Sequence, residues 1–307
     1  MSKALLITGA TGKQGGAVID ALIASPSSND FTIFAVTRNP SSPSATALSQ
    51  KAQNIKVIQG NLDDCPAIFA TANTPIWGVF SVQLPFGGGA TPATEERQGK
   101  ALIDAALANQ VHHFVYASVD RGGAKSSSDP TNVPHFISKH NIEKHLEEKS
   151  AGGSKMSYTI LRPVAFMENL TPDFMGKMFA TMWKSALAPD RKLQLISTTD
   201  IGYFTAEAFS HPEDSQYKNT SISLAGDDLT FDEASAVFQK VVGTPMPSTF
   251  GILGQGLMWM MADLGIMFRW INANGYAADI AALKKQDPNL LSFADWLKKK
   301  ESGFVKD

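Results

Sequence analysis

The stretch KALLITGATGKQGG at residues 3–16 decides the fold. Its apolar run leads into three glycines spaced three apart, Gly9, Gly12 and Gly15, and a helical pattern follows at 14–24. In a strand–turn–helix loop, the first glycine allows a tight turn, the second lets the backbone approach a diphosphate, and the third lets the helix pack against the strand. Main-chain N–H groups and the helix dipole then hold the anion. The stretch predicts a dinucleotide-binding loop, and the alternative is an ordinary glycine-rich turn.

Short β-rich runs alternate with helical patterns through the first half of the chain. The predicted strands are 4–8, 31–37, 55–59, 77–83, 113–118 and 157–162. The predicted helices lie near 14–24, 43–53, 64–72, 93–109 and 139–149. Because the strands lack strict polar alternation and are separated by helices, they indicate an α/β fold with a doubly wound parallel sheet. Ligands of such folds bind at the carboxyl ends of the strands.

After Pro163 the regular alternation breaks down. Helical patterns near 168–186, 200–211, 230–242 and 252–271 are joined by strand-like pieces at 194–196 and 221–224. We therefore expect a nucleotide-binding domain over 1–163 and a smaller, mostly helical substrate-side region over 164–307. The two parts of the chain are expected to interleave.

The composition favours a water-soluble globular protein. Of the 307 residues, 43% are hydrophobic and 18% are charged, and 27 basic against 29 acidic residues give a net charge of −2. This balance argues against direct binding to nucleic acid or to an anionic membrane. The single cysteine, Cys65, excludes an internal disulfide and a thiolate metal cluster, and reads as a small buried hydrophobe rather than a nucleophile. No cleavable signal fits the amino terminus, so we expect a cytoplasmic protein, with access to the nucleus left open.

Residues 252–271, ILGQGLMWMMADLGIMFRWI, approach the length of a membrane span. Asp263, Arg269 and Gln255 interrupt the apolar run, whereas a span carries few or no charges. Methionine and tryptophan at helical spacing suit an adaptable pocket wall, a lid or a contact between subunits. We expect one of these roles rather than membrane insertion, and a homodimer remains open.

The end of the second predicted strand bears on the choice between NAD and NADP. An acidic residue there would bind the ribose 2′-hydroxyl and repel a 2′-phosphate, but the strand ends Val36-Thr37-Arg38-Asn39. A guanidinium on a phosphate contributes about 1.5–3 kcal/mol. Arg38 therefore favours NADP(H), unless it is only a solvated strand-end residue. Lys13 adds a second positive charge, and Asn61 either bonds the adenine edge or forms a plain turn.

Together, these motifs resemble the NmrA-like family of atypical short-chain dehydrogenases/reductases. The matching segments are TGATGKQGG at 8–16, Thr37-Arg38, GNLDD at 60–64, VFSVQ at 79–83, FVYASV at 114–119, HFISKHNIEKHL at 135–146 and LRPVAFMEN at 161–169, and Asp200-Ile201-Gly202 resembles a further element. The resemblance implies a Rossmann domain that binds NADP(H). The implied cofactor-binding residues are Gly9, Thr11, Gly12, Lys13, Gln14, Gly15, Arg38, Asn61, Leu62, Gln83, Lys139, Pro163, Val164 and Phe166.

The catalytic pattern departs from that of active short-chain dehydrogenases, which carry a Tyr-x-x-x-Lys pair. Here the lysine position is Lys139 and the tyrosine position is His135. Histidine is itself a general acid near neutral pH, and the resemblance keeps Lys139 as an acid or electrostatic stabiliser. Ser118 matches the usual catalytic serine. The alternatives are a ribose-holding Lys139, a strand-capping Ser118 and a His135 that lies in a loop or only shapes the pocket.

The predicted helix 139–149 carries further charged side chains. His140 and His145 follow His135 at intervals of five, which does not place them on one helical face as a metal site requires. Glutamates at 143, 147 and 148 alternate with lysines at 139, 144 and 149, a pattern typical of a solvated helix face.

Two functions follow from the sequence. The first is an NADPH-dependent reductase of a small carbonyl, enone or quinone-like substrate, in which Lys139, Ser118 or His135 handles the substrate oxygen. The second is a non-catalytic NADP(H) redox sensor that regulates a protein partner, which the missing tyrosine favours.

Overall fold

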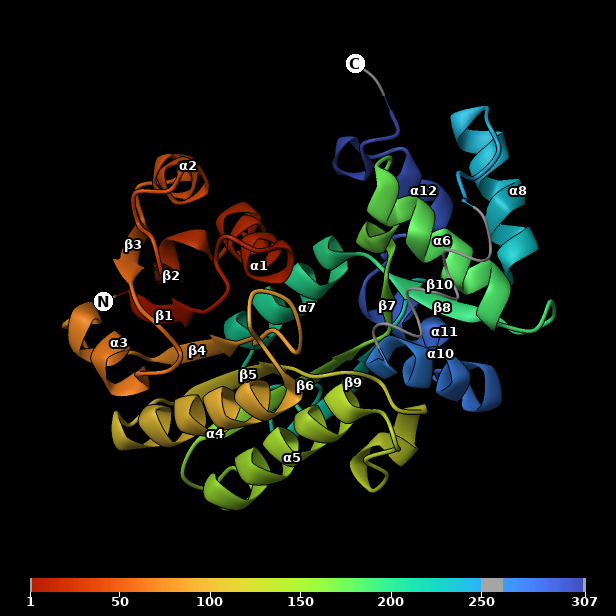
Figure 1. The fold of residues 1–307 in the computed structure, drawn as a ribbon. Coiled ribbons are helices and arrows are strands. Elements are labelled where there is room, and N and C mark those ends of the chain that lie inside the picture. Colours follow the sequence, from red (N-terminus) through yellow and green to blue (C-terminus); the bar gives the residue numbers. More distant parts are fainter. Residues whose placement is uncertain (1, 250–261, 306–307) are drawn as a thin grey trace. The chain divides into compact units, whose positions relative to one another are not determined.

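The computed structural model describes residues 2–249 and 262–305. The chain divides into two compact units (Figure 1). The first unit comprises Met1–Ser118, Ser138–Arg162 and Ile201–Ile222. The second comprises Val119–Ile137, Pro163–Asp200 and Ser223–Asp307. Each unit is described by itself.

A seven-stranded sheet forms the centre of the first unit, in the order β3-β2-β1-β4-β5-β6-β9 (Figure 1). Its neighbours from β3 to β6 pair in parallel. The strands are β1 (Lys3–Ile7), β2 (Phe31–Thr37), β3 (Ile55–Gln59), β4 (Gly78–Ser81), β5 (His113–Ala117), β6 (Ser157–Pro163) and β9 (Thr220–Leu224). The order reverses direction between β1 and β4, which is where doubly wound sheets bind nucleotides. The predicted Rossmann-type α/β fold is confirmed.

Helices cover both faces of this sheet. They are α1 (Lys13–Ala24), α2 (Pro43–Lys51), α3 (Cys65–Ala72), α4 (Pro92–Ala108), α5 (Pro134–Lys149) and α7 (Thr198–Ser210). Apolar side chains of α3, α4 and α5 form one buried cluster with the strands. On the other face, α1 and α7 touch closely, because a Cβ at Gly202 would lie 2.4 Å from the carbonyl oxygen of Ala17.

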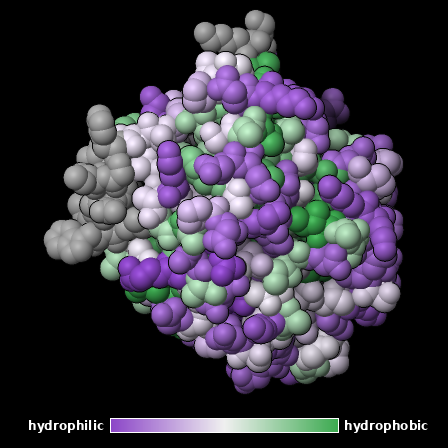
Figure 2. All heavy atoms as spheres, turned by 90° about the vertical axis from the view of Figure 1, so that its right-hand side faces the viewer, coloured by the Kyte–Doolittle hydropathy of each residue, from purple (hydrophilic) through white to green (hydrophobic). Residues whose placement is uncertain are grey.

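The second unit is mostly helical and contains a three-stranded sheet in the order β10-β8-β7. Its elements are β7 (Ala165–Phe166), β8 (Leu193–Ile196), β10 (Asp227–Leu229), α6 (Phe174–Ala186), α8 (Phe231–Val242), α10 (Ala262–Asn274), α11 (Ile280–Gln286) and α12 (Phe293–Leu297). Buried aromatic side chains from several of these elements form its core, among them Trp183, Phe238, Phe268 and Trp296. On the face drawn in Figure 2, hydrophilic side chains predominate and apolar ones appear in small groups.

Two helix starts differ from the predictions. Helix α5 begins at Pro134 rather than near 139, because proline is preorganised for a first helical turn. His135 therefore lies in a helix, and its interpretation as a loop residue is wrong. Helix α6 begins at Phe174 rather than near 168, because the Asp173 carboxylate accepts from the Gly176 N–H (3.1 Å) and caps the helix there.

The predicted helix at 252–271 is described only in part. Residues 252–261 lie outside the described residues, and α10 covers the remainder and continues to Asn274. Within the described parts of the chain, no helix combines the length and the apolar character that a membrane crossing needs.

Candidate functional site

The glycine loop joins β1 to α1 at the point where the strand order reverses. Gly9 has a φ of +59°, which glycine adopts without strain. The Gly12 N–H donates to the Gly9 carbonyl oxygen (2.8 Å) and closes the turn. A Cβ at Gly15 would lie 2.3 Å from the same carbonyl oxygen, so only glycine fits. The Thr8 hydroxyl donates to the Phe80 carbonyl (3.0 Å) and thereby ties the loop to β4. The predicted tight turn and close helix packing are both present.

The start of α1 is suited to an anion. Its N-cap is Gly12, which has no side chain to satisfy the first N–H groups, and the first turn carries no acidic residue. Such a helix start presents unsatisfied donors and the positive end of the dipole. A cavity of about 240 Å³ adjoins the loop and is lined by Thr11, Gly12 and residues of α2, including Lys51.

Two amide side chains flank this loop, the half-buried Gln14 and the buried Gln83. Gln14 lies in the first turn of α1, and Gln83 follows β4. Among the described residues, the Oε1 atom of each is buried and has no hydrogen-bond partner. The Gln83 amide nitrogen donates to the Ser81 hydroxyl (2.9 Å), which fixes that side chain. Because buried polar atoms are normally satisfied, both oxygens are candidates for bonds to a ligand.

Further predicted nucleotide-binding residues of the first unit are Lys13, which begins α1, and residues that follow β2 and β3. Lys13 and Arg38 are exposed, and because β1 and β2 are parallel neighbours, both leave the same edge of the sheet. The Asn61 side chain accepts from the Asp63 N–H (3.2 Å), which is a turn contact, and Leu62 packs against the core.

Lys139 belongs to a buried polar cluster between α4 and α5. Its ammonium donates to Glu95 Oε1 (2.7 Å), and the Ser138 hydroxyl donates to Glu95 Oε2 (2.5 Å). Glu95 is fully buried, and Lys139 is 8% exposed. The Lys139 ammonium is therefore neutralised by a carboxylate in the same unit.

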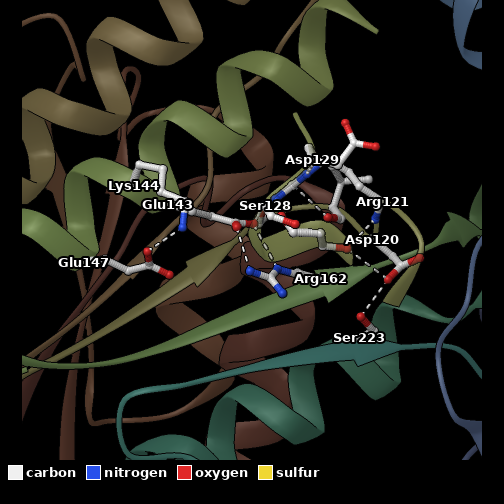
Figure 3. Close-up of polar contacts among 12 residues, drawn as sticks. Asp120, Arg121, Ser128, Asp129, Glu143, Lys144, Glu147, Arg162 and Ser223 are labelled. Carbon is white, nitrogen blue, oxygen red and sulfur yellow. Dashed lines mark hydrogen bonds and ion pairs between the residues drawn. The ribbon is translucent and has the colours of Figure 1, made fainter. Parts of the chain in front are cut away.

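Ser118 lies beside a second buried ion pair. Glu143 of α5 binds the Arg162 guanidinium through both oxygens (2.8 and 3.2 Å), as Figure 3 shows. The Ser118 hydroxyl also donates to Glu143. All three side chains are buried. The Ser118 hydroxyl therefore donates to a carboxylate of the protein, whereas the sequence predicts a bond to the substrate oxygen.

The prediction of a solvated face on α5 is wrong for two of its residues. Lys139 and Glu143 are buried, whereas Lys144 and Glu147 form an exposed pair (2.8 Å; Figure 3). Glu95 is a further residue of this cluster that the motifs of the sequence do not identify. Its spacing to Gly99, Leu102 and Ile103 places it on the apolar face of α4, a signal that could have identified it.

The remaining predicted site residues belong to the second unit. Pro163 ends β6, Val164 is buried, and Phe166 lies in β7. His135, at the start of α5, contacts Asp263 of α10 through its Nδ1 atom (2.5 Å). The first unit therefore contains the glycine loop, Arg38, Gln83, Ser118 and Lys139, and the second unit contains His135.

The loop after β5 is held by a buried network in the second unit. Asp120 accepts from the N–H groups of Gly122, Gly123 and Ala277 and from the Ser223 hydroxyl (2.6 Å; Figure 3). The buried Arg121 guanidinium donates to backbone carbonyls of the same loop. These bonds satisfy two buried charges and order the segment.

The described residues include neither a cluster of metal ligands nor a reactive thiol. No group of three or more His, Cys, Asp or Glu side chains is arranged for a metal ion there. Burial raises the pKa of the Cys65 thiol to about 11, so the thiol is protonated at neutral pH.

A model of the NmrA-like family matches residues 1–297. The chain belongs to the NmrA-like family. The resemblance predicted from the motifs is confirmed, and it extends well beyond the first 170 residues that carried it. Among relatives of this family, the chain is 28% identical over 268 residues to the NmrA-like family domain-containing oxidoreductase FrzB of Cladobotryum sp, which covers 79% of this chain and 74% of the relative.

Solved structures of similar fold support the architecture. NADPH-dependent quinone oxidoreductase QOR2 from Escherichia coli, crystallised with NADPH, is 23% identical, with a TM-score of 0.71 over 96% of this chain and 98% of that one. NmrA, a negative transcriptional regulator crystallised with NADP, is 16% identical, with a TM-score of 0.70 over 100% of this chain and 98% of that one. At these sequence identities, the structural similarity shows that the chain shares the fold of these proteins.

Asp200, in the segment that resembled a further element of the NmrA-like family, is expected to make stability depend on pH. It is 3% exposed, and burial raises the pKa of its carboxyl from 3.8 to about 7, to which the nearby Asp287 and Glu168 carboxylates add. Because the folded state holds this proton more tightly than the unfolded state, the group stabilises the fold at low pH. That contribution is lost as pH rises from about 4 to about 7.

We expect ionisation of the Asp200 carboxyl group to lower the free energy of unfolding by about 2 kcal/mol between pH 5 and pH 7. Urea unfolding of the wild type and of Asp200→Asn at both pH values checks this. The amide does not titrate, so the variant should lose less stability than the wild type over this interval. Equal losses in the two proteins would contradict the assignment.

Proposed function

We propose that this chain binds NADP(H) on its first unit and reduces a small carbonyl, enone or quinone-like substrate. The observation that carries the proposal is the glycine cradle at the start of α1, flanked by the unsatisfied amide oxygens of Gln14 and Gln83. The oxidoreductase relative and the NADPH-bound structure of similar fold support the same assignment.

The residues of the first unit fit the cofactor in chemical type. The uncapped start of α1 offers N–H donors to the diphosphate, and the cradle formed by Gly9 and Gly15 excludes side chains from its path. The two amide oxygens can accept from ribose hydroxyls or from a carboxamide. When bound, the cofactor supplies the hydride, and the protein's task is to position it and to provide a proton for the substrate oxygen.

Arg38 is proposed to select the phosphorylated cofactor. It is exposed, leaves the edge of the sheet next to the loop, and replaces the carboxylate expected in an NAD site. Arg38→Ala should weaken NADPH binding about 10- to 100-fold, which corresponds to the loss of one charge-assisted phosphate contact. Calorimetric titration with NADPH and NADH checks this. NADH affinity should stay unchanged, and an equal loss for both nucleotides would contradict the role in selection.

The reductase is tested by NADPH consumption with purified protein and a panel of quinones, enones and aldehydes. Loss of NADPH absorbance that requires the organic substrate, with formation of the reduced product, would support the proposal. Tight NADPH binding with no turnover of any substrate would contradict it.

A second function, a non-catalytic NADP(H) sensor, is favoured by one observation. The Lys139 ammonium and the Ser118 hydroxyl are both bonded to buried carboxylates, those of Glu95 and Glu143. In a sensor, these groups would hold the fold rather than handle a substrate. A protein partner retained in only one cofactor state, together with absent turnover, would support this function.

A further inference from the structure

The connection from β4 to α4, residues 82–90, belongs wholly to the first unit. It begins directly beside the glycine loop. The Val82 N–H donates to the Thr8 hydroxyl (2.9 Å), and a Cβ at Gly9 would lie 2.7 Å from Val82 Cγ1. The next residue, Gln83, is buried, and its Oε1 atom is one of the two amide oxygens that flank the loop. The start of the connection is therefore fixed against the proposed nucleotide site.

The end of the connection is fixed as well, because α4 begins with a capping box. The Thr94 N–H donates to the Thr91 hydroxyl (3.2 Å), and the Thr91 N–H donates to the Thr94 hydroxyl (2.8 Å). Such reciprocal bonds hold the first turn of a helix in place. Residues 84–90 remain between the two fixed ends, and we call them the flap.

The flap turns on three successive glycines. Gly87, Gly88 and Gly89 have φ values of +88°, +59° and +85°, which other residues adopt only with strain. The Ala90 N–H donates to the Gly87 carbonyl oxygen (3.0 Å) and closes the turn. No atom of the described chain lies within 4 Å of the position that a Cβ would take on any of the three glycines. A segment with this backbone freedom and so little packing opens and closes at low cost.

The flap also presents an apolar side chain next to the proposed nucleotide site. Leu84, which follows the fixed Gln83, is 63% exposed. A single exposed leucine is ordinary on a protein surface, but this one stands between a residue held at the site and a turn that is free to move. Its apolar surface would leave water when the flap closes on a bound molecule, and this burial favours the closed state.

We propose that the flap closes over the nucleotide after it binds to the first unit, with Leu84 covering it. This inference rests on the nucleotide binding of the proposed function. The three glycines act as the hinge, and Gln83 and Thr91 are the fixed ends. Closure retains the nucleotide by adding an apolar contact. It also excludes water from the diphosphate, so the attraction between the N–H groups and the anion becomes stronger.

Hydrogen exchange followed by mass spectrometry tests closure without any turnover. NADPH should slow amide exchange in the flap by at least about 5-fold. The turn at 150–154 is the internal control, because it lies in the first unit and also carries an open glycine of positive φ, Gly152. Exchange in that turn should be the same with and without NADPH. A flap that exchanges equally fast in both states of a protein that binds NADPH would overturn the proposal.

The release rate of the nucleotide tests the role of Leu84. Leu84→Ser should raise the release rate of NADPH about 10-fold, measured in a stopped-flow fluorimeter by chasing the bound nucleotide with excess NADP⁺. The association rate should change by less than about 3-fold, because the nucleotide binds before the flap closes. Leu84→Met keeps an apolar side chain and should release NADPH at the wild-type rate. One release rate for all three proteins would contradict the proposal.

The exchange experiment also separates this inference from the proposed function. Protection of the glycine loop at 9–16 without protection of the flap refutes closure and leaves the nucleotide site standing. No protection of either segment, together with no binding heat for NADPH, refutes both.

Discussion

Gly15→Ala is expected to abolish measurable NADPH binding and to destabilise the fold by about 3 kcal/mol. The added Cβ would lie 2.3 Å from the Gly9 carbonyl oxygen and 2.6 Å from that of Thr8. Both obstacles are backbone atoms, so relief requires α1 to move away from β1. That movement would displace the N–H groups proposed to hold the diphosphate. Thermal unfolding and calorimetric titration with NADPH measure the two effects.

Gly16→Ala is the matched control for this prediction. It adds the same methyl group one residue later in α1, where the nearest atom, the Ala10 carbonyl oxygen, is 3.6 Å away. That is an ordinary contact, and alanine also favours the helix. The control should keep its stability and its NADPH affinity within a few-fold. If both variants behaved alike, the close approach at Gly15 would not be what shapes the loop.

Glu143→Ala should cost about 3–5 kcal/mol of unfolding free energy. The substitution leaves the Arg162 guanidinium, which is 3% exposed, without the carboxylate that binds it through two hydrogen bonds. It also removes the acceptor of the Ser118 hydroxyl. An unpaired buried charge is far more costly than a lost surface contact, so the expected loss is a large part of a typical domain's stability. Urea unfolding followed by circular dichroism measures it.

Glu147→Ala, one turn further along α5, serves as the comparison. Glu147 pairs with Lys144 on an exposed face, where an ion pair contributes at most about 1 kcal/mol. A similar loss in both variants would mean that the pair between Glu143 and Arg162 is no more important than a surface contact.

The sheet was largely predictable from the sequence. Strands β2 and β3 have the predicted bounds, and β1, β4, β5 and β6 differ from the predictions only at their ends, because a buried parallel strand is a continuous apolar run. The glycine loop was equally predictable, because each glycine stands where a side chain would clash or strain the backbone. The short strands β7 and β10 were not, because two or three residues carry no periodicity and depend on pairing with β8.

The polar contacts of the site were less predictable. From the sequence alone, Glu95 and Glu143 cannot be told from surface charges. A charged side chain is buried only where the tertiary structure supplies a partner, and these partners are Lys139 and Arg162. The same holds for the contact between His135 and Asp263, which lie 128 positions apart in the sequence. The sequence named the candidate residues Lys139, Ser118 and His135, but only the fold shows what each is bonded to.

Calorimetric titration of the wild-type protein with NADPH, and separately with NADH, tests the central claim most directly. The glycine cradle and Arg38 together predict binding of one nicotinamide nucleotide per chain, with NADPH at least 10-fold tighter. Absence of binding heat for both nucleotides over a range of temperatures would contradict the nucleotide site and the functions built on it. Binding of NADH alone would contradict the role of Arg38 and leave the cradle in place.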